Sequence, residues 1–336
     1  MDTDQITRPL AQLRRPWSDH RAERTLGAVS LLTCVCVIAM IVFVAIRAWP
    51  AFAHNGLGLL SSGADVDKQM GGMVTTGVHP AASAYHLNAW PILYGTLLTT
   101  AIALLLGLPI ALLSSIFIVE FAPAPLRRVT VPVVRLLASV PSVIYGLIGV
   151  LVLVPFVGNH VITASEKTSA QSTVLLTGAG LGVAALILTV MIVPIMVALI
   201  SEALATVPAA WREGAMALGV HRLRATLAVS LKAIRPAIVA AAALACARAL
   251  GEAVMISMVS GSRSFAPSLH YGLVTFFAEP LRTLASAIVD YSEGLGGAPA
   301  LNSTLYAFAL LLLFSAIVLS LGAYLVKLPL RKHQLR

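Results

Sequence analysis

The stretch Thr173-Val-Leu-Leu-Thr-Gly-Ala-Gly-Leu-Gly-Val-Ala-Ala-Leu-Ile-Leu-Thr-Val-Met-Ile-Val-Pro-Ile-Met-Val-Ala-Leu-Ile-Ser201 carries no charged side chain. A transmembrane helix needs about 20 consecutive, mostly apolar residues to cross the hydrocarbon core of a bilayer. A long apolar run without charge is typical of such a span. This stretch therefore predicts a helix that crosses a membrane.

Five further windows on both sides of this stretch meet the same criterion. The six predicted spans are Thr25–Ala48, Pro91–Val119, Val129–Val157, Thr173–Ser201, Pro236–Ser260 and Asn302–Val326. The composition agrees, because 58% of the 336 residues are hydrophobic and 11% are charged, against about 25% charged in a soluble domain. The predicted fold class is an all-α polytopic membrane protein with six transmembrane helices.

Basic residues are distributed unevenly between the windows. Most of them lie in the two terminal tails and in the second and fourth connections, whereas the opposite connections carry only Lys68, Lys167, Arg263 and Arg282. Connections rich in Lys and Arg stay in the cytoplasm. We therefore expect a multi-pass protein of the inner (plasma) membrane, in contact with membrane lipids and with both termini cytoplasmic.

The predicted organisation follows from the windows. It is a cytoplasmic tail over residues 1–24, a first transmembrane helix over 25–48, an irregular outer loop over 49–90, a core with five transmembrane helices over 91–326 and a cytoplasmic tail over 327–336. The core includes a long inner connection over 202–235.

Soluble functions find little support in the sequence. The net charge of +9 could indicate nucleic-acid binding, but no patch of Lys and Arg interleaves with aromatic residues, so nucleic acid is not an expected partner. The chain has no Gly-rich phosphate loop, no His-Glu-x-x-His and no Gly-x-Ser-x-Gly motif,. The pair Cys34 and Cys36 lies in an apolar window and is interpreted as two small apolar residues. No catalytic residue, no metal site and no cofactor bound by this chain are expected.

The inner connection predicts a short helix that ends in a turn. Pro208 suits the first turn of a helix, because its missing N–H has no partner there. Trp211, Ala215 and Leu218 repeat at helical spacing and form one apolar face,. Gly219 is placed to end the helix in a left-handed turn.

A second helix restarts after this turn through Leu223, Leu227 and Leu231 and runs into the fifth window. The two helices and the glycine turn would form a rigid knob that fits a partner's groove and transmits its motion to the spans. The pattern alone equally allows an ordinary helical hairpin that lies on the bilayer.

Two windows carry polar residues at membrane depth. Arg248 and Glu252, spaced four apart, are predicted to share one helix face,. Charged residues inside a span are costly and usually face a bundle interior or a water path. Because the fork of Arg fits an oxyanion, we favour a role in solute passage over an internal ion pair that only positions the helix. Arg135 is a further cation within a window.

The third window contains a proline among hydroxyl side chains. Pro141 removes a backbone donor and should break or kink the helix,. A broken helix at membrane depth leaves polar backbone groups that suit a solute site. Ser139, Ser142 and Tyr145 add hydroxyls to it. A plain proline kink is the alternative.

The inner connection resembles the EAA loop of ABC importer permeases. The resemblance lies in Glu213-Gly-Ala-x-x-x-Gly219, followed by Val229-x-Leu231 just before a window. In that family the loop forms coupling helices that dock onto ATPase subunits. The coupling residues implied here are Trp211, Glu213, Gly214, Ala215, Leu218 and Gly219. Two positions depart from the family pattern: Gly214 replaces an Ala, and Lys232 replaces the usual Pro.

Two membrane segments are similar to the phosphate-specific (Pst) importer permeases. They are Val140-Pro-Ser-Val-Ile-Tyr-Gly-Leu147, and Arg248-Ala-Leu-Gly-Glu252 with Met258-Val-x-Gly261. The second segment resembles the C-type subunit more than the A-type. The segment from Thr283 to Gly294 fits the last outer loop of that family, and the whole resemblance runs from about Tyr94 to the C-terminus.

This resemblance implies an ABC importer permease (MetI-like) fold and a permease that imports inorganic phosphate. The implied substrate path is formed by Arg135, Ser139, Pro141, Ser142, Tyr145, Arg248 and Glu252. The implied partners are an A-type permease in a heterodimer, two copies of an ATPase and an external phosphate-binding protein. ATP and magnesium would be held by the ATPase.

Two alternatives stay open. A sulfate or molybdate permease belongs to the same class, and the segment Val140–Gly146 argues against it. An ion-driven secondary transporter belongs to another class. Inverted repeats would favour it; we find none in the sequence, and the EAA-like loop favours coupling to ATP.

Overall fold

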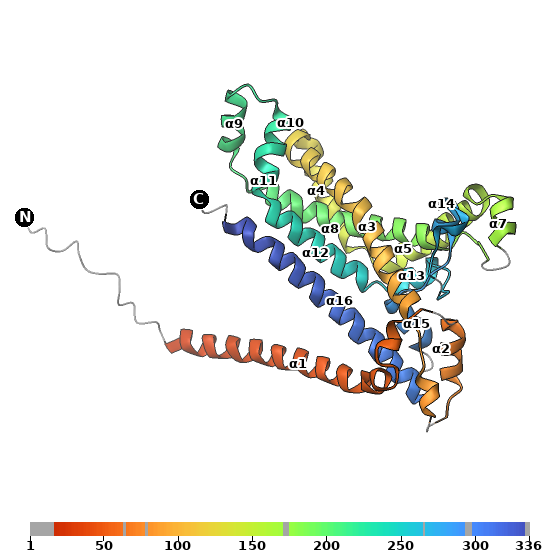
Figure 1. Cartoon of the computed structure of the whole chain (residues 1–336). Helices are drawn as coiled ribbons and strands as arrows, with labels where there is room; N and C mark the ends of the chain where they lie inside the picture. The colour runs from red at the N-terminus through yellow and green to blue at the C-terminus, as the bar shows by residue number, and fades with distance from the viewer. Residues whose placement is uncertain are drawn as a thin grey trace, which may run out of the picture. The chain divides into compact units, whose positions relative to one another are not determined.

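The computed structural model describes residues 17–62, 65–77, 80–170, 175–264, 266–292 and 298–332. Helices dominate these residues (Figure 1), so the predicted all-α fold class is confirmed. Within them, one isolated parallel bridge joins Gly261 and Leu281. The chain divides into two compact units, Met1–Ile46 and Arg47–Arg336.

The helices follow one another along the chain as labelled in Figure 1. Their bounds are α1 Trp17–Asn55, α2 Val66–Val74, α3 Trp90–Ile116, α4 Ala124–Ser139, α5 Ser142–Ile148, α6 Val154–Phe156, α7 Ala164–Ala170, α8 Leu181–Ala205, α9 Ala209–Ala217, α10 Arg222–Ala225, α11 Leu231–Ala233, α12 Arg235–Leu250, α13 Val254–Val259, α14 Leu273–Ala278, α15 Leu284–Tyr291 and α16 Pro299–Lys332. Several of these helices are extended by turns of π-helix. These turns are η4 (Phe117–Phe121), η5 (Gly149–Leu153), η6 (Val157–Val161) and η7 (Thr226–Ser230).

Helical stretches of membrane-spanning length account for the predicted windows. Among the described residues, five are long and apolar enough to cross a bilayer: Ala22–Asn55, Ala82–Phe121, Ser142–Val161, Leu181–Ala205 and Pro299–Gly322. A sixth would be formed by Arg222–Ala233 and Arg235–Leu250, which meet at a bend of 72°. Pro236 lies in the first turn after this bend, where its missing N–H is tolerated,.

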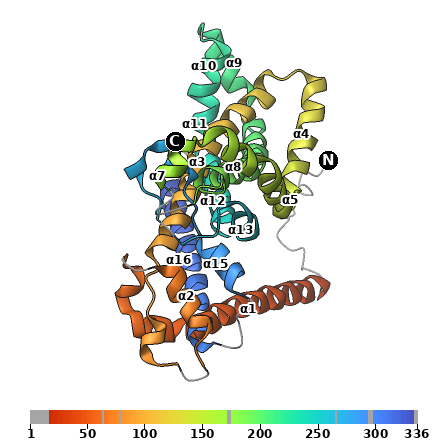
Figure 2. The ribbon, with the colours of Figure 1, turned by 90° about the vertical axis from the view of Figure 1, so that its right-hand side faces the viewer.

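Helix α8 forms the centre of the second unit. Figure 2 shows it among α3, α4, α5 and α12, which all pack against it. Leu188, Met191, Ile192, Met196 and Ile200 are almost completely buried on α8. A helix that is apolar on all sides is typical of such a buried position. The predicted span Thr173–Ser201 therefore supplies the core of the fold, but its predicted start is wrong, because α8 begins at Leu181 after the extended backbone of Gly180.

The third predicted window, Val129–Val157, is not one helix. Helix α4 ends at Ser139, and the membrane-length stretch is Ser142–Val161. Pro141 causes the interruption, because it has no N–H for the helical ladder and disfavours helical backbone at Val140. The predicted break is confirmed, whereas the predicted bounds of this span are wrong.

The outer loop over residues 49–90 is not irregular. It contains α2, which buries Val66, Met70 and Met73. These side chains pack in one cluster with Leu301 and Phe308 of α16. The helical spacing of the three buried residues explains the helix, but the abundant glycines nearby conceal that pattern in the sequence.

Candidate functional site

The structure brings the two membrane segments singled out in the sequence into contact. Helix α5 packs against α13, and the contact depends on glycine. A Cβ on Gly146 would lie 3.2 Å from the Cα of Met255 and 2.8 Å from the Sδ of Met258. Small residues allow such close helix contacts in membranes. The predicted path segments are therefore neighbours in space.

Two hydroxyls bond to carbonyls that precede the break at Pro141, and one of them, that of Tyr145, reaches across it. Tyr145 Oη donates a hydrogen bond of 3.0 Å to the carbonyl of Leu137, and Ser139 Oγ donates one of 2.8 Å to the carbonyl of Leu136. Both carbonyls belong to the last turn of α4, where intrahelical donors run out. The hydroxyl oxygens of Ser139 and Tyr145 can still accept hydrogen bonds from a solute or water.

The prediction that Arg248 and Glu252 share one helix face is wrong. Helix α12 ends at Leu250 with Gly251 as its cap, so Glu252 lies beyond the helix. The carboxylate of Glu252 instead accepts a hydrogen bond of 3.2 Å from the N–H of Met255, in the first turn of α13. A carboxylate at this position satisfies a free amide and complements the helix dipole.

Arg248 lies in the last turn of α12 and is exposed. It forms no ion pair with any residue that the structure describes. A cation near a helix C-terminus is favoured by the dipole. The arrangement leaves the guanidinium available for an anion.

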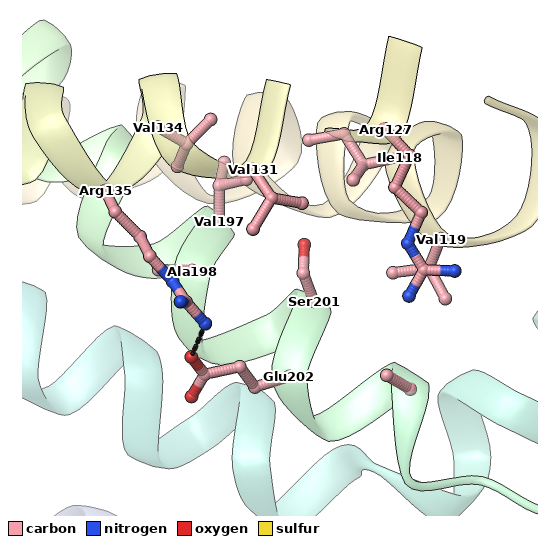
Figure 3. Close-up of a pocket in the computed structure, with 11 residues that line it drawn as sticks. Ile118, Val119, Arg127, Val131, Val134, Arg135, Val197, Ala198, Ser201 and Glu202 are labelled. Carbon is pink, nitrogen blue, oxygen red and sulfur yellow. Dashed lines mark hydrogen bonds and ion pairs between the residues drawn. The ribbon is translucent and has the colours of Figure 1, made fainter. Parts of the chain in front are cut away.

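Arg135 occupies a different environment from Arg248. Its guanidinium forms an ion pair of 2.8 Å with Glu202, near the end of α8 (Figure 3). Both side chains are about 60% exposed, and an exposed pair of this kind contributes roughly 0–1 kcal/mol to stability. The pair borders a cavity between α4 and α8.

The inner connection forms the predicted two helices joined by a turn, namely α9, the turn at Gly219 and α10, which are called the knob from here on. Gly219 has φ +82°, so the predicted left-handed turn is confirmed. Trp211 is 57% exposed and Leu218 86% exposed. Trp211 lies on α9 and Leu218 caps its end, and large apolar side chains exposed together in this way are typical of a surface that binds a partner.

The knob is tied to the end of α3 by charges that the sequence pattern did not reveal. Glu120, in η4, is buried and forms an ion pair with Arg212 of α9. The guanidinium of Arg222 lies over the ring of Phe121, 5.2 Å from its centroid. The only sequence signal for Glu120 is a lone carboxylate at the edge of an apolar window, which has no partner nearby in the sequence.

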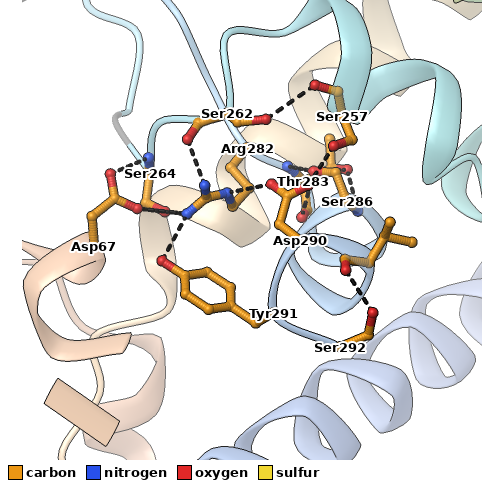
Figure 4. Close-up of polar contacts among 11 residues, drawn as sticks. Asp67, Ser257, Ser262, Ser264, Arg282, Thr283, Ser286, Asp290, Tyr291 and Ser292 are labelled. Atoms are coloured by element: carbon orange, nitrogen blue, oxygen red, sulfur yellow. Dashed lines mark hydrogen bonds and ion pairs between the residues drawn. The ribbon is translucent and has the colours of Figure 1, made fainter. Parts of the chain in front are cut away.

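A second buried charge cluster, the Arg282 cluster, joins three helices (Figure 4). Its members are Arg282, Asp67, Ser257, Ser262, Ser264, Asp290 and Tyr291. The guanidinium of Arg282 bonds to Asp67 of α2 at 2.6 Å and to Asp290 of α15 at 3.1 Å. Asp290 in turn accepts a hydrogen bond from Ser257 of α13.

The guanidinium of Arg282 also supports a left-handed turn. It donates a hydrogen bond of 2.5 Å to the carbonyl of Ser262, which has φ +46°, an uncommon conformation for a residue other than glycine,. In the sequence, Arg282 counted only as one of a few basic residues on the outer side. The cluster could not be recognised there, because Asp67 and Arg282 are far apart along the chain.

Comparison with known proteins identifies the class. No protein-family model matches the chain. A chain in the crystal structure of a bacterial alginate ABC transporter, solved in complex with its alginate-bound periplasmic protein, resembles it with a TM-score of 0.56. The two are 18% identical over 92% of this chain and 96% of that one. The fold is that of an ABC transporter permease (MetI-like).

Curated relatives identify the family within this class. The phosphate transport system permease protein PstC 1 of Mycobacterium tuberculosis is 34% identical over 227 residues, which are 65% of this chain and 67% of the relative. The probable PstC of Methanocaldococcus jannaschii is 34% identical over 253 residues, 74% of this chain and 77% of the relative. A probable ABC transporter permease, YqgH of Bacillus subtilis, is 29% identical over 75% of both chains. The chain belongs to the PstC family of phosphate transport system permease proteins.

The family that the sequence indicates is thus confirmed. The chain is a multi-pass inner-membrane permease of an ABC importer.

Proposed function

We propose that this chain provides part of the path by which inorganic phosphate crosses the membrane in an ATP-driven importer. One observation carries the proposal: Arg248 lies at the end of a membrane helix without a carboxylate partner among the described residues. A planar guanidinium binds tetrahedral oxyanions through two parallel hydrogen bonds. The phosphate permeases among its relatives support this choice of substrate.

Glu252 is proposed to limit how long phosphate stays bound. Its carboxylate caps α13 and follows α12 by two residues. A negative charge near the cation weakens anion binding, and a transport site must release its ligand as well as capture it. Ser142 and the hydroxyl oxygens of Ser139 and Tyr145 are proposed to complete the polar lining beside the break at Pro141.

The knob is proposed to dock onto an ATPase subunit. Trp211 and Leu218 supply its exposed apolar contacts, with Glu213, Gly214 and Ala215 between them. The ion pair of Arg212 with Glu120 connects this surface to α3. The complete importer would contain an A-type permease, two ATPase copies that hold ATP and magnesium, and an external phosphate-binding protein.

Uptake of labelled phosphate tests the proposal. The chain would be expressed with its A-type partner, the ATPase and the external phosphate-binding protein in a strain that lacks its own phosphate permeases. We expect uptake that requires ATP and that unlabelled phosphate inhibits, whereas sulfate and molybdate do not. Inhibition by sulfate or molybdate instead of phosphate would support the alternative oxyanion permease, and uptake driven by an ion gradient without ATP hydrolysis would support a secondary transporter.

A further inference from the structure

A cavity of about 170 Å³ lies between α4, η4 and the last turns of α8 (Figure 3). Its walls are mainly apolar and include Ile118, Val131, Val134, Val197 and Ala198. Such a wall suits hydrocarbon, because covering apolar surface is favourable. The cavity is separate from the contact between α5 and α13.

Two arginines border the cavity. Arg127 and Arg135 both belong to α4, and eight residues of helix place their Cα atoms about 12 Å apart. Arg135 uses one of its nitrogens for Glu202, which leaves it further donors. The side chain of Arg127 has no hydrogen-bond or ion-pair partner in the part of the chain that the structure describes.

A buried hydroxyl lies between these arginines. Ser201 lines the cavity, and Figure 3 shows its side chain pointing toward Val131 of α4. Its Oγ is buried and has no hydrogen-bond partner among the described residues. Buried hydroxyls are normally paired, so this one indicates that the cavity receives a polar group.

The surface of α4 adds a further property. Leu126, Val129, Val133 and Leu136 are exposed on this helix, which also carries Arg127, Arg128 and Arg135. A helix that combines exposed apolar residues with several cations is typical of the interface between a membrane and water, where it attracts anionic lipids.

We propose that this cavity binds an anionic phospholipid. Arg127, Arg135 and Ser201 would contact the phosphodiester oxygens, and the valines of the wall would contact the glycerol and the start of an acyl chain. Free inorganic phosphate could use the same polar groups, but it has no apolar part and would leave the valine walls uncovered. A phospholipid therefore fits both the polar groups and the apolar walls of the cavity. The proposal assigns Arg135 to this site instead of the substrate path that the family resemblance implies, and the other residues of the path do not line the cavity.

Native mass spectrometry of the assembled complex tests the proposal. The complex would be purified from nanodiscs that contain equal amounts of phosphatidylglycerol and phosphatidylethanolamine. We expect phosphatidylglycerol to be retained in preference. Arg127→Gln and Ser201→Ala should each weaken its retention, for Arg127→Gln by about fivefold, because one arginine near an anionic headgroup contributes roughly this factor.

Arg128→Gln is the matched control, since Arg128 carries the same charge on the same helix but does not line the cavity. It should retain phosphatidylglycerol as the unaltered chain does. Equal losses in Arg127→Gln and Arg128→Gln would overturn the proposal in favour of a diffuse surface charge. Displacement of the lipid by millimolar inorganic phosphate would overturn it in favour of a free-anion site. If the Arg127→Gln complex fails to assemble, Ser201→Ala still tests the site, because it removes only a hydroxyl and should weaken retention of phosphatidylglycerol.

Discussion

Among single residues, Arg248 is expected to matter most for transport. Arg248→Ala should lower phosphate uptake per assembled complex by about tenfold or more, since a hydrogen bond to a charged group contributes roughly 1.5–3 kcal/mol. Arg248→Lys should restore part of the uptake, because a point charge lacks the planar fork. Labelled uptake, divided by the amount of copurified ATPase, measures this effect. Near-normal uptake by Arg248→Ala would remove the residue from the path.

Glu252→Gln serves as the comparison for Arg248→Ala. An amide oxygen can still cap the N–H of Met255,, so α13 should keep its place while the negative charge is lost. Phosphate uptake per assembled complex should therefore change less in Glu252→Gln than in Arg248→Ala. If the two residues only positioned the helices, the variants would lower protein abundance while uptake per assembled complex stayed near normal.

The carboxyl of Glu279 makes the free energy of unfolding depend on pH. Burial raises the pKa of its carboxyl above the usual range, although the N–H of Ser268 lowers it. Its folded-state pKa therefore exceeds its unfolded-state pKa, and the burial penalty grows as pH rises through the interval between them. Glu279→Gln should raise the melting temperature at neutral pH. This advantage should vanish below the ordinary pKa of glutamate; an equal advantage at every pH would contradict the explanation.

Among the contacts between helices, the ion pair that joins the knob to η4, at the end of α3, is the one best suited to mutagenesis. Glu120 is buried beneath Arg212, and removal of one partner from a buried pair costs about 3–5 kcal/mol. Arg212→Ala should therefore uncouple ATP hydrolysis from uptake, measured as phosphate imported per ATP. The exchanged pair, Glu120→Arg with Arg212→Glu, should recover part of this ratio. A double variant as poor as the single one would show that the pair itself is not the connection.

The turn between α9 and α10 is a second element that can be tested separately. Gly219 has φ +82°, a conformation that is costly for a β-branched residue. No atom lies within 4 Å of a Cβ placed there, so backbone strain is the main effect. Gly219→Val should weaken copurification of the ATPase and lower uptake while membrane insertion persists. Gly72→Ala, at a helical glycine of α2 with equally open surroundings and outside the knob, is the control and should leave both unchanged.

The membrane topology of the whole chain is predicted from the number of its spans and from the distribution of its basic residues. Counting the bent pair as one, the described residues contain six candidate spans, and an even number predicts that both termini lie on one side. The unequal distribution of Lys and Arg predicts that this side is the cytoplasm. Reporter fusions after Gly158 should report the outside, and fusions after Arg128 and Arg224 the inside. An outside signal after Arg224 would reverse the assignment.

Much of the architecture could be predicted because apolar length is a local property. The uncharged stretch that forms α8 needs no partner to be recognised, and Pro141 and Gly219 act through their own backbones. Gly251 acts locally as well, but the regular spacing of Arg248 and Glu252 concealed the end of the helix there. The partners of Glu120 and Arg282 depend on tertiary packing, which leaves no periodic signal in one sequence.

The Arg282 cluster has a mechanical consequence for the outer side of the molecule. One guanidinium holds α2 and α15, and Asp290 connects it to α13. Stretching any of these bonds would expose a buried charge, so the three helices should travel as one rigid body when the permease changes conformation. Among the described residues no ion pair crosses the segments around Gly251 and Pro141, so we expect rotation to be absorbed there. A single arginine thus determines where the moving part ends and the hinge begins.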